Sequence, residues 1–174
     1  MNLLVNNIPT SLDEIEDMKW VPYASSVGSL MYAMVSTIPY IVHVVGVLSQ
    51  FMENLGKSHW DAVKRVLWYL KGTSPYTLYY QGNSVGSNRS VSIQGYVDAD
   101  WARQIDKRRS TSGYVFMVNG GAISWMRKWQ SVTALSTTEA EYMEFTHACQ
   151  EVFWLKCLYS DIDYDTRRIA AFLW

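Results

Sequence analysis

The first third of the chain carries apolar residues at helical spacing. After Pro22 they recur every three or four residues until Pro39, which predicts a first helix between the two prolines. Residues 40–54 are apolar around most of a helical circumference, which predicts a second, largely buried helix. Ser58, with Asp61 three residues later, is typical of a helix start, and Gly72 of a helix end, so a third helix is predicted there.

The pattern becomes strand-like beyond residue 75. Residues 76–81 have the composition of a strand. Residues 82–90 are rich in Gly, Ser and Asn, and we interpret them as a flexible linker between two regions. Beyond the linker, residues 91–100 and 113–118 are predicted strands, and residues 119–121 (NGG) form a hairpin turn that leads into a third strand over 122–126.

A long helix is predicted behind the third strand. Ser136 and Glu139 are spaced as a capping box. Six residues then recur at intervals of three or four, and we interpret them as one continuous apolar face that packs on the strands: Tyr142, Phe145, Cys149, Val152, Leu155 and Tyr159. A hairpin followed by such a helix predicts a layered α/β or α+β arrangement.

Composition and charge narrow the class of protein. A chain of 174 residues with 49% hydrophobic residues is long and apolar enough for one domain, or one domain plus a docked extension. Its net charge of −1 means that any binding to a polyanion depends on local clusters of basic residues. Cys149 and Cys157 would lie about 12 Å apart on one helix, too far for a disulfide, so both are predicted to be free thiols.

The first 20 residues are predicted to be a poorly ordered, acidic lead-in. They lack the basic and apolar pattern of a signal peptide. No apolar run in the sequence has the length of a membrane-spanning helix. These features predict an intracellular protein of the cytoplasm or nucleus.

Four carboxylates are candidates for chemistry. Asp98 and Asp100 end the first predicted strand of the second region, and Glu139 and Glu141 begin the long helix. If that helix packs across the sheet, these side chains converge on a hard-oxygen site suited to Mg²⁺ or Mn²⁺, and two such ions can promote phosphodiester hydrolysis. The same residues have a structural explanation in turn chemistry and helix capping, so spacing alone leaves both interpretations open.

Four sequence motifs strengthen the first interpretation. Residues 95–102 read GYVDADWA, residues 109–116 read RSTSGYVF, residues 121–125 read GAISW, and residues 134–142 read ALSTTEAEY. In this order they resemble the ribonuclease H domain of copia-type retrotransposon Pol polyproteins. Residues 21–34 and 59–73 resemble the segment that connects reverse transcriptase to ribonuclease H in the same polyproteins.

The resemblance implies a ribonuclease H-like fold and Mg²⁺- or Mn²⁺-dependent hydrolysis of the RNA strand of RNA–DNA hybrids during reverse transcription. It also implies a reverse transcriptase domain in the same polyprotein. By motif, Asp98 and Glu141 match the family's catalytic aspartate and glutamate, with Asp100 as a supporting metal ligand. Five basic residues are candidates for phosphate contacts, although charge runs are commonly solvated surface: Lys107, Arg108, Arg109, Arg127 and Lys128.

Two departures from the family pattern limit the expected activity. The family carries a third catalytic aspartate on a later strand, and residues 161–168 do not resemble that motif. Glu144 replaces a small residue one turn after Glu141. We therefore expect an incomplete α/β, ribonuclease H-like fold with three antiparallel strands and a long helix, and little or no nuclease activity in the isolated chain.

The predicted organisation is a disordered lead-in over residues 1–20, a helical connection segment over 21–81, and a partial ribonuclease H-like domain over 91–174. The alternative function is that of a repurposed, non-catalytic binding or interaction protein, either effector-like or the product of a degenerate gene.

Overall fold

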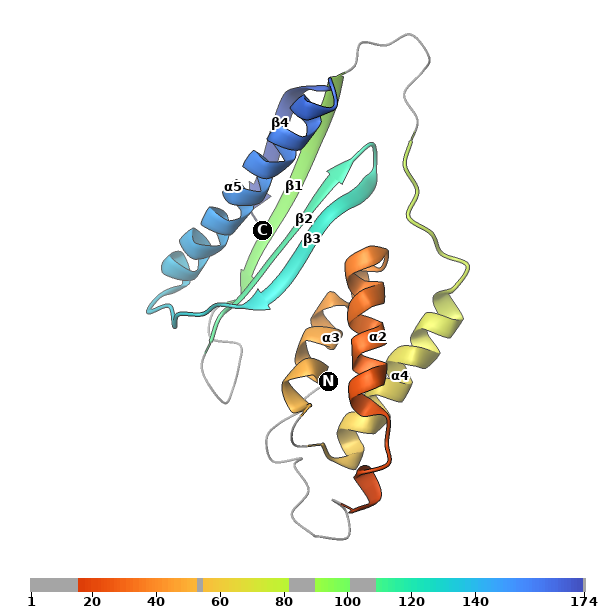
Figure 1. Cartoon of the computed structure of the whole chain (residues 1–174). Coiled ribbons are helices and arrows are strands. Elements are labelled where there is room, and N and C mark those ends of the chain that lie inside the picture. The colour runs from red at the N-terminus through yellow and green to blue at the C-terminus, as the bar shows by residue number, and fades with distance from the viewer. Residues whose placement is uncertain (1–15, 53–54, 82–89, 101–108, 174) are drawn as a thin grey trace. The chain divides into compact units, whose positions relative to one another are not determined.

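The computed structural model describes residues 16–52, 55–81, 90–100 and 109–173. The chain divides into two units, Met1–Thr77 and Leu78–Trp174, and Figure 1 shows the elements of each. Three parts of the sequence prediction lie outside the described residues: most of the predicted lead-in, residues 82–89 of the predicted linker, and the candidate residues Lys107 and Arg108.

The first unit is helical. It contains α2 (Tyr23–Ser36), α3 (Val42–Leu48) and α4 (Lys57–Thr73), with short 3₁₀ turns η2 (Pro39–Ile41) and η3 (Ser49–Phe51) on either side of α3. The three helices share one core, built largely from β-branched and leucine side chains. The buried Tyr23 hydroxyl donates to the carbonyl of Leu48 at 2.8 Å, which ties α2 to the end of α3.

The helix α4 begins one residue before the predicted cap, Ser58. Gly56 occupies the N-cap, and its backbone N–H donates to Nδ1 of His59 at 3.0 Å. The His59 ring is fully buried and stacks on Phe51 with ring centroids 4.2 Å apart. A buried imidazole in the first turn therefore does the capping that the sequence assigned to a serine.

The second unit is a four-stranded sheet with one long helix. The strands β1 (Ser90–Asp100), β2 (Thr111–Val118), β3 (Gly121–Trp129) and β4 (Asp165–Leu173) lie in the order β3-β2-β1-β4, and α5 (Thr137–Asp161) connects β3 to β4. β1, β2 and β3 form antiparallel pairs, whereas β4 is parallel to β1. The expected three-stranded antiparallel sheet is therefore corrected to a four-stranded mixed sheet.

The hairpin between β2 and β3 confirms the predicted turn. Asn119 and Gly120 have φ angles of 50° and 81°, a conformation that Asn and Gly accept most readily. The predicted strand over residues 76–81 is wrong. Those residues pair with no strand, and the segment is held instead by a hydrogen bond from the Tyr80 hydroxyl to the Ala122 carbonyl at 2.7 Å.

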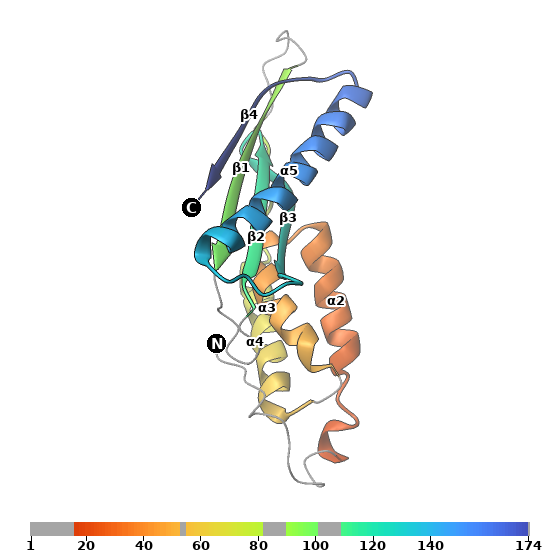
Figure 2. The same ribbon diagram turned by 90° about the vertical axis from the view of Figure 1, so that its left-hand side faces the viewer.

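The core of the second unit lies between α5 and one face of the sheet. Val91, Ile93 and Val97 of β1 are buried there, together with side chains of β2 and α5. Figure 2 shows α5 running along this face. Because successive strand residues point to opposite faces, the even-numbered residues of β1, including Asp98, lie on the face away from α5.

The helix α5 is confirmed, but its predicted buried face is partly wrong. Leu155 is buried and Val152 and Tyr159 pack against the core, as predicted. Tyr142, Phe145 and Cys149 are exposed. The residues buried in their place are Ala140, Glu144 and Ala148.

Candidate active site

One end of the sheet gathers four chain segments. Asp100 at the end of β1 pairs with Thr111 at the start of β2, and Thr111 pairs with Trp129 at the end of β3. The parallel strand β4 reaches the same end, where Leu173 pairs with Val97. The carboxyl end of β1, which carries Asp98, therefore lies among the ends of all the other strands.

The start of α5 is fixed at this same end. The Ser136 hydroxyl caps the helix by accepting from the backbone N–H of Glu139 at 3.1 Å. Gln130, which follows β3, donates from its side-chain amide to the Ala140 carbonyl and to the Ser112 hydroxyl, both at 2.9 Å. These contacts set the height and the rotation of the first turns of α5 relative to β2, and so determine where Glu141 lies.

The predicted catalytic residues are solvent-accessible at this end. Asp98 on β1 and Glu141 on α5 are both exposed. Asp98 lies on the face of the sheet away from α5, so the structure brings the two residues to the same end of the sheet but not to the same face. Asp100 forms a salt bridge with Arg127 of β3, with 3.3 Å between Oδ2 of Asp100 and Nη2 of Arg127. Within the described part of the chain, no group of three or more His, Cys, Asp or Glu side chains is placed to hold a metal ion.

The basic candidate residues do not form one patch. Arg127 and Lys128 are consecutive on β3 and so point to opposite faces of the sheet. Arg127 lies with Asp100 on the face away from α5, whereas Lys128 lies on the α5 side, opposite Ser112. Arg109 is half-buried. A nucleic-acid strand on either face would meet only part of the predicted set.

Glu144 is the residue at this end whose environment is most unusual. Its side chain is fully buried between α5 and the sheet, and neither carboxyl oxygen makes a hydrogen bond of good geometry. Burial raises the pKa of Glu144, and the negative charge of Asp98 raises it further, while the Ser112 hydroxyl and the Lys128 ammonium act in the opposite direction. Glu144 is four residues from both Ala140 and Ala148, which places all three on one side of the helix. This spacing is the signal in the sequence that could have indicated a buried position.

A second, half-buried carboxylate of α5 has a hydrogen-bond partner. Glu151 accepts from the Ser124 hydroxyl at 2.6 Å. Burial, and after it the nearby charge of Glu151, raises the pKa of Tyr114 to about 12. Tyr114, Ser124 and Glu151 therefore form a polar contact between α5 and the hairpin, and this contact accounts for Glu151 without any catalytic role.

Geometry thus defines a class of protein: a helical unit joined to a mixed α/β unit, with exposed carboxylates where β1 ends and α5 begins. The chain is 52% identical over 148 residues to the retrovirus-related Pol polyprotein from transposon TNT 1-94 of Nicotiana tabacum, a match of 85% of this chain and 11% of that polyprotein. It is 36% identical over 140 residues to the Pol polyprotein from transposon RE2 of Arabidopsis thaliana, a match of 80% of this chain and 9% of that protein. The chain belongs to the copia-type retrotransposon Pol family, and it spans about a tenth of the length of these polyproteins.

A shorter relative matches over nearly its whole length. The chain is 51% identical over 138 residues to secreted RxLR effector protein 161 of Plasmopara viticola, a match of 79% of this chain and 94% of that protein. No protein-family model and no solved structure matches the chain. In the described residues, no helix combines the length and apolarity needed to cross a membrane. Both cysteines are free, as predicted.

Proposed function

We propose that this chain is the part of a retrotransposon Pol polyprotein that supplies the first two carboxylates of a ribonuclease H site. Asp98 and Glu141 would bind Mg²⁺ or Mn²⁺, and the bound ions would activate water for hydrolysis of the RNA strand of an RNA–DNA hybrid. The observation that supports this assignment is the meeting of the carboxyl end of β1 with the first turns of α5 at one end of the sheet. Both carboxylates lie in motifs that resemble those of the family.

The strand order adds to the support. In the described residues, three antiparallel strands are followed by a crossover helix and a strand parallel to the first; the three antiparallel strands and the helix are the elements that the resemblance implies. Because β4 runs parallel to β1, it points toward Asp98. In a longer Pol polypeptide, residues that follow β4 would reach the same end of the sheet, where a further carboxylate would join the first two.

The 174-residue chain is expected to cleave hybrids weakly or not at all. A two-metal site needs enough oxygen ligands to hold both ions, and the described residues gather fewer than three potential ligand side chains in any one place. The expected role of this chain alone is to bind hybrid, with the specificity for RNA carried by contacts to its 2′-hydroxyl groups.

Two versions of the chain test the proposal. The first is the 174-residue chain. The second is the same chain extended beyond Trp174 by the residues that follow the matched region in the tobacco relative. Each is incubated with a labelled RNA strand annealed to DNA, with Mg²⁺ or Mn²⁺, and binding is measured in parallel by fluorescence anisotropy. We expect cleavage by the extended chain only, abolished by Asp98→Asn or Glu141→Gln with little change in binding.

Asp100→Asn is the matched control, since Asp100 already pairs with Arg127; it should reduce cleavage less than Asp98→Asn. Strong cleavage by the 174-residue chain that disappears in Asp98→Asn would refute the expected weakness of the isolated chain. A folded extended chain that binds hybrid and never cleaves it would refute the assignment of Asp98 and Glu141.

The alternative is a non-catalytic interaction protein. One observation favours it: the relative named a secreted RxLR effector has almost the same span as the matched part of this chain, so polypeptides of this size occur as separate proteins. If both versions of the chain fold correctly and neither binds hybrid, this alternative would be favoured over the nuclease proposal.

A further inference from the structure

The helix α5 carries a second apolar face, directed away from the sheet. Tyr142, Phe145 and Phe153 are 70%, 41% and 70% exposed, and Cys149 between them is also exposed. At 100° per residue these four side chains lie within an arc about 80° wide on the helix. The buried residues Ala140, Ala148 and Leu155 lie on the other side.

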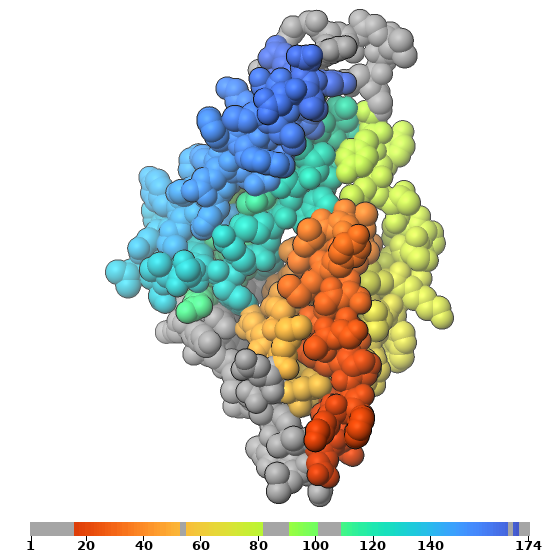
Figure 3. Space-filling view, in the orientation of Figure 1, coloured from red at the N-terminus to blue at the C-terminus, as the bar shows by residue number. Residues whose placement is uncertain are grey.

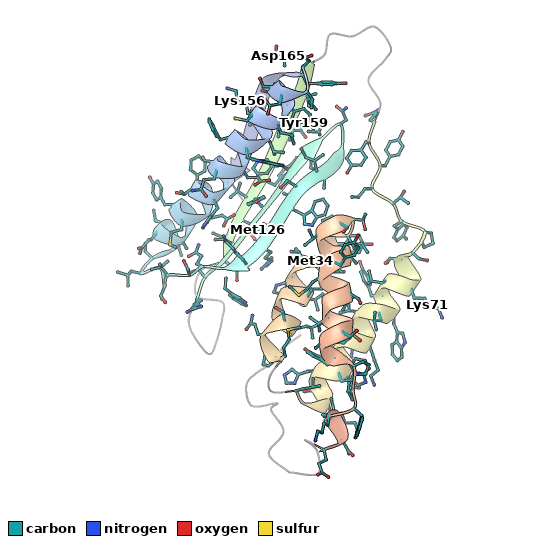
Figure 4. All side chains as sticks on the ribbon, in the orientation of Figure 1. Met34, Lys71, Met126, Lys156, Tyr159 and Asp165 are labelled. Carbon is teal, nitrogen blue, oxygen red and sulfur yellow. The ribbon has the colours of Figure 1, made fainter. Side chains whose placement is uncertain are left out.

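The figures show the same arrangement. In Figure 3 the blue helix α5 lies at the surface of its unit along its length. Figure 4 places Lys156 on the side of α5 away from the strands and Tyr159 on the side toward them. The outward face defined by Tyr142, Phe145, Cys149 and Phe153 is called the outer stripe below.

The outer stripe is large for a surface without a partner. Its three aromatic side chains, Tyr142, Phe145 and Phe153, offer roughly 360 Å² to solvent, given about 200 Å² for a fully exposed ring. Contiguous apolar patches of more than a few hundred Å² mark interaction sites. A standard interface buries about 800 Å² on each partner, so the stripe supplies a little under half of one.

The stripe is symmetric in sequence about its centre. Phe145 precedes Cys149 by four residues, and Phe153 follows it by four. If two α5 helices pack antiparallel about a twofold axis at Cys149, each Phe145 meets Phe153 of the partner subunit. A twofold interface uses the same patch on both copies, and this stripe is complementary to itself in that orientation.

Charge selects the same orientation. Glu139 and Glu141 are exposed in the first turns of α5, and Lys156 is exposed near its other end. In the antiparallel pair, Lys156 of the partner subunit is level with Glu141 to within one residue, or about 1.5 Å along the helix. A parallel pair would place Glu141 against Glu141 and Lys156 against Lys156, which is unfavourable.

We propose that the occupant of the outer stripe is a second copy of this chain, bound as an antiparallel α5–α5 dimer centred on Cys149. The interface brings Lys156 of the partner subunit beside each Glu141. The dimer does not depend on nuclease activity, and its failure would leave the proposed function untouched.

The first test is the mass of the 174-residue chain in solution, measured by sedimentation over a range of concentrations. We expect twice the 20.0 kDa mass of one chain. Phe153→Lys should give the monomer, because it places a charge in the centre of the contact from a position that is exposed within one chain. Trp68→Lys is the control: Trp68 is 71% exposed on α4, outside the outer stripe, and this variant should remain dimeric.

The second test is thiol crosslinking with diamide, which accepts the two electrons and two protons released as two thiols form a disulfide. Helix axes 8–10 Å apart would place facing Cys149 Cα atoms about 5 Å apart, within disulfide range. The Cys157→Ser variant, which retains Cys149, should form a linked dimer. The Cys149→Ser variant should not, because the two Cys157 residues would lie about 24 Å apart along the pair.

Three results would overturn the proposal. They are a monomer at every concentration, a dimer that persists in Phe153→Lys, and crosslinking through Cys157 in preference to Cys149. The last result would retain a dimer but exclude the antiparallel register.

Discussion

Replacing the buried carboxyl of Glu144 with an amide should stabilise the second unit at neutral pH. Glu144 is fully buried, its oxygens lack hydrogen bonds of good geometry, and burial raises the pKa of Glu144. The folded state therefore holds the Glu144 proton more tightly than the unfolded state does. The stability that comes from this proton is fully present below the usual glutamate pKa and is lost as the pH rises through that pKa toward the raised one.

The magnitude follows from the cost of an unsatisfied buried polar group. Leaving such a group without partners costs about 1–3 kcal/mol, and more when it is charged. Glu144→Gln keeps the shape and removes the ionisation, so the variant should be more stable by about 1–3 kcal/mol near pH 7. For a unit of this size, each kcal/mol raises the Tm by roughly 4–8 °C.

The assay is thermal and urea unfolding followed by circular dichroism and tryptophan fluorescence, from acidic pH to pH 8. The gain in stability from Glu144→Gln should shrink toward zero as the pH falls, since Glu144 is then protonated in both folded and unfolded states. Glu151→Gln is the matched control, because Glu151 accepts a 2.6 Å hydrogen bond from Ser124. This second substitution keeps an acceptor for the Ser124 hydroxyl but removes its charge. It should destabilise the unit by about 1 kcal/mol, the difference between a hydrogen bond to a charged group and one to a neutral group.

A Glu144→Gln variant that is less stable than the parent at pH 7 would refute this reasoning, and so would a gain that is the same at every pH. Either result would mean that the carboxylate has partners that the structure lacks, or that the site opens to water when the group ionises.

Three further substitutions test the packing of each unit, all by thermal or urea denaturation. A Cβ at Gly95 would stand 2.8 Å from Cδ1 of Phe116, so Gly95→Ala should lower the stability of the second unit by about 1–3 kcal/mol. Gly28 lies on α2 with open space around it, so Gly28→Ala should raise the stability of the first unit by about 0.5–1 kcal/mol. Ser136→Ala removes the cap of α5 and should cost about 1 kcal/mol, while Ser136→Gly should cost only a few tenths. Burial lowers the pKa of His59, so the stability of the first unit should fall as the pH drops through the usual histidine pKa. His59→Gln keeps an acceptor for the Gly56 N–H and should remove this dependence of stability on pH.

Local signals predicted the hairpin and the start of α5. Asn119 and Gly120 adopt positive φ, and the alternating residues on either side pair as expected, because turn chemistry is encoded within a few residues. The capping box at Ser136 is equally local, and it marks the first turn of α5. The residues that position Glu141 were therefore readable from the sequence.

Elements that depend on distant partners were missed. The strand β4 follows a tail rich in Asp, and its pairing with β1 spans more than seventy residues of chain, so no local pattern marks it. The opposite error occurred over residues 76–81. Their composition favours extended backbone, but the structure pairs them with no strand, although β3 is an edge of the sheet and accepts a hydrogen bond from the Tyr80 hydroxyl.

The buried face of α5 was mispredicted in its first half because the largest apolar side chains of this helix are not the buried ones. A helix that lies close to a sheet needs small residues at the contact, and Ala140 and Ala148 meet that need on either side of Glu144. Large aromatic residues dominate a hydrophobic periodicity, yet Tyr142 and Phe153 are largely exposed. A search for the apolar face therefore favours the wrong side of the helix in its first half.

The rotation of α5 is fixed by contacts at its start, which explains why the helix does not turn to bury its aromatic side. The amide of Gln130 holds the Ala140 carbonyl, and the Glu151–Ser124 hydrogen bond holds the next part of the helix. Turning the outer stripe toward the sheet would break both contacts and force rings into the space that two alanines occupy. Such a turn would release Glu144 from a burial that is costly at neutral pH, but the broken contacts and the crowding outweigh that gain. The observed rotation of α5 therefore leaves Glu144 buried and the outer stripe exposed, and both are unfavourable in one chain. A partner that covers the stripe removes the cost of exposing it. The stability of the second unit should accordingly rise with protein concentration in the parent chain and stay constant in Phe153→Lys.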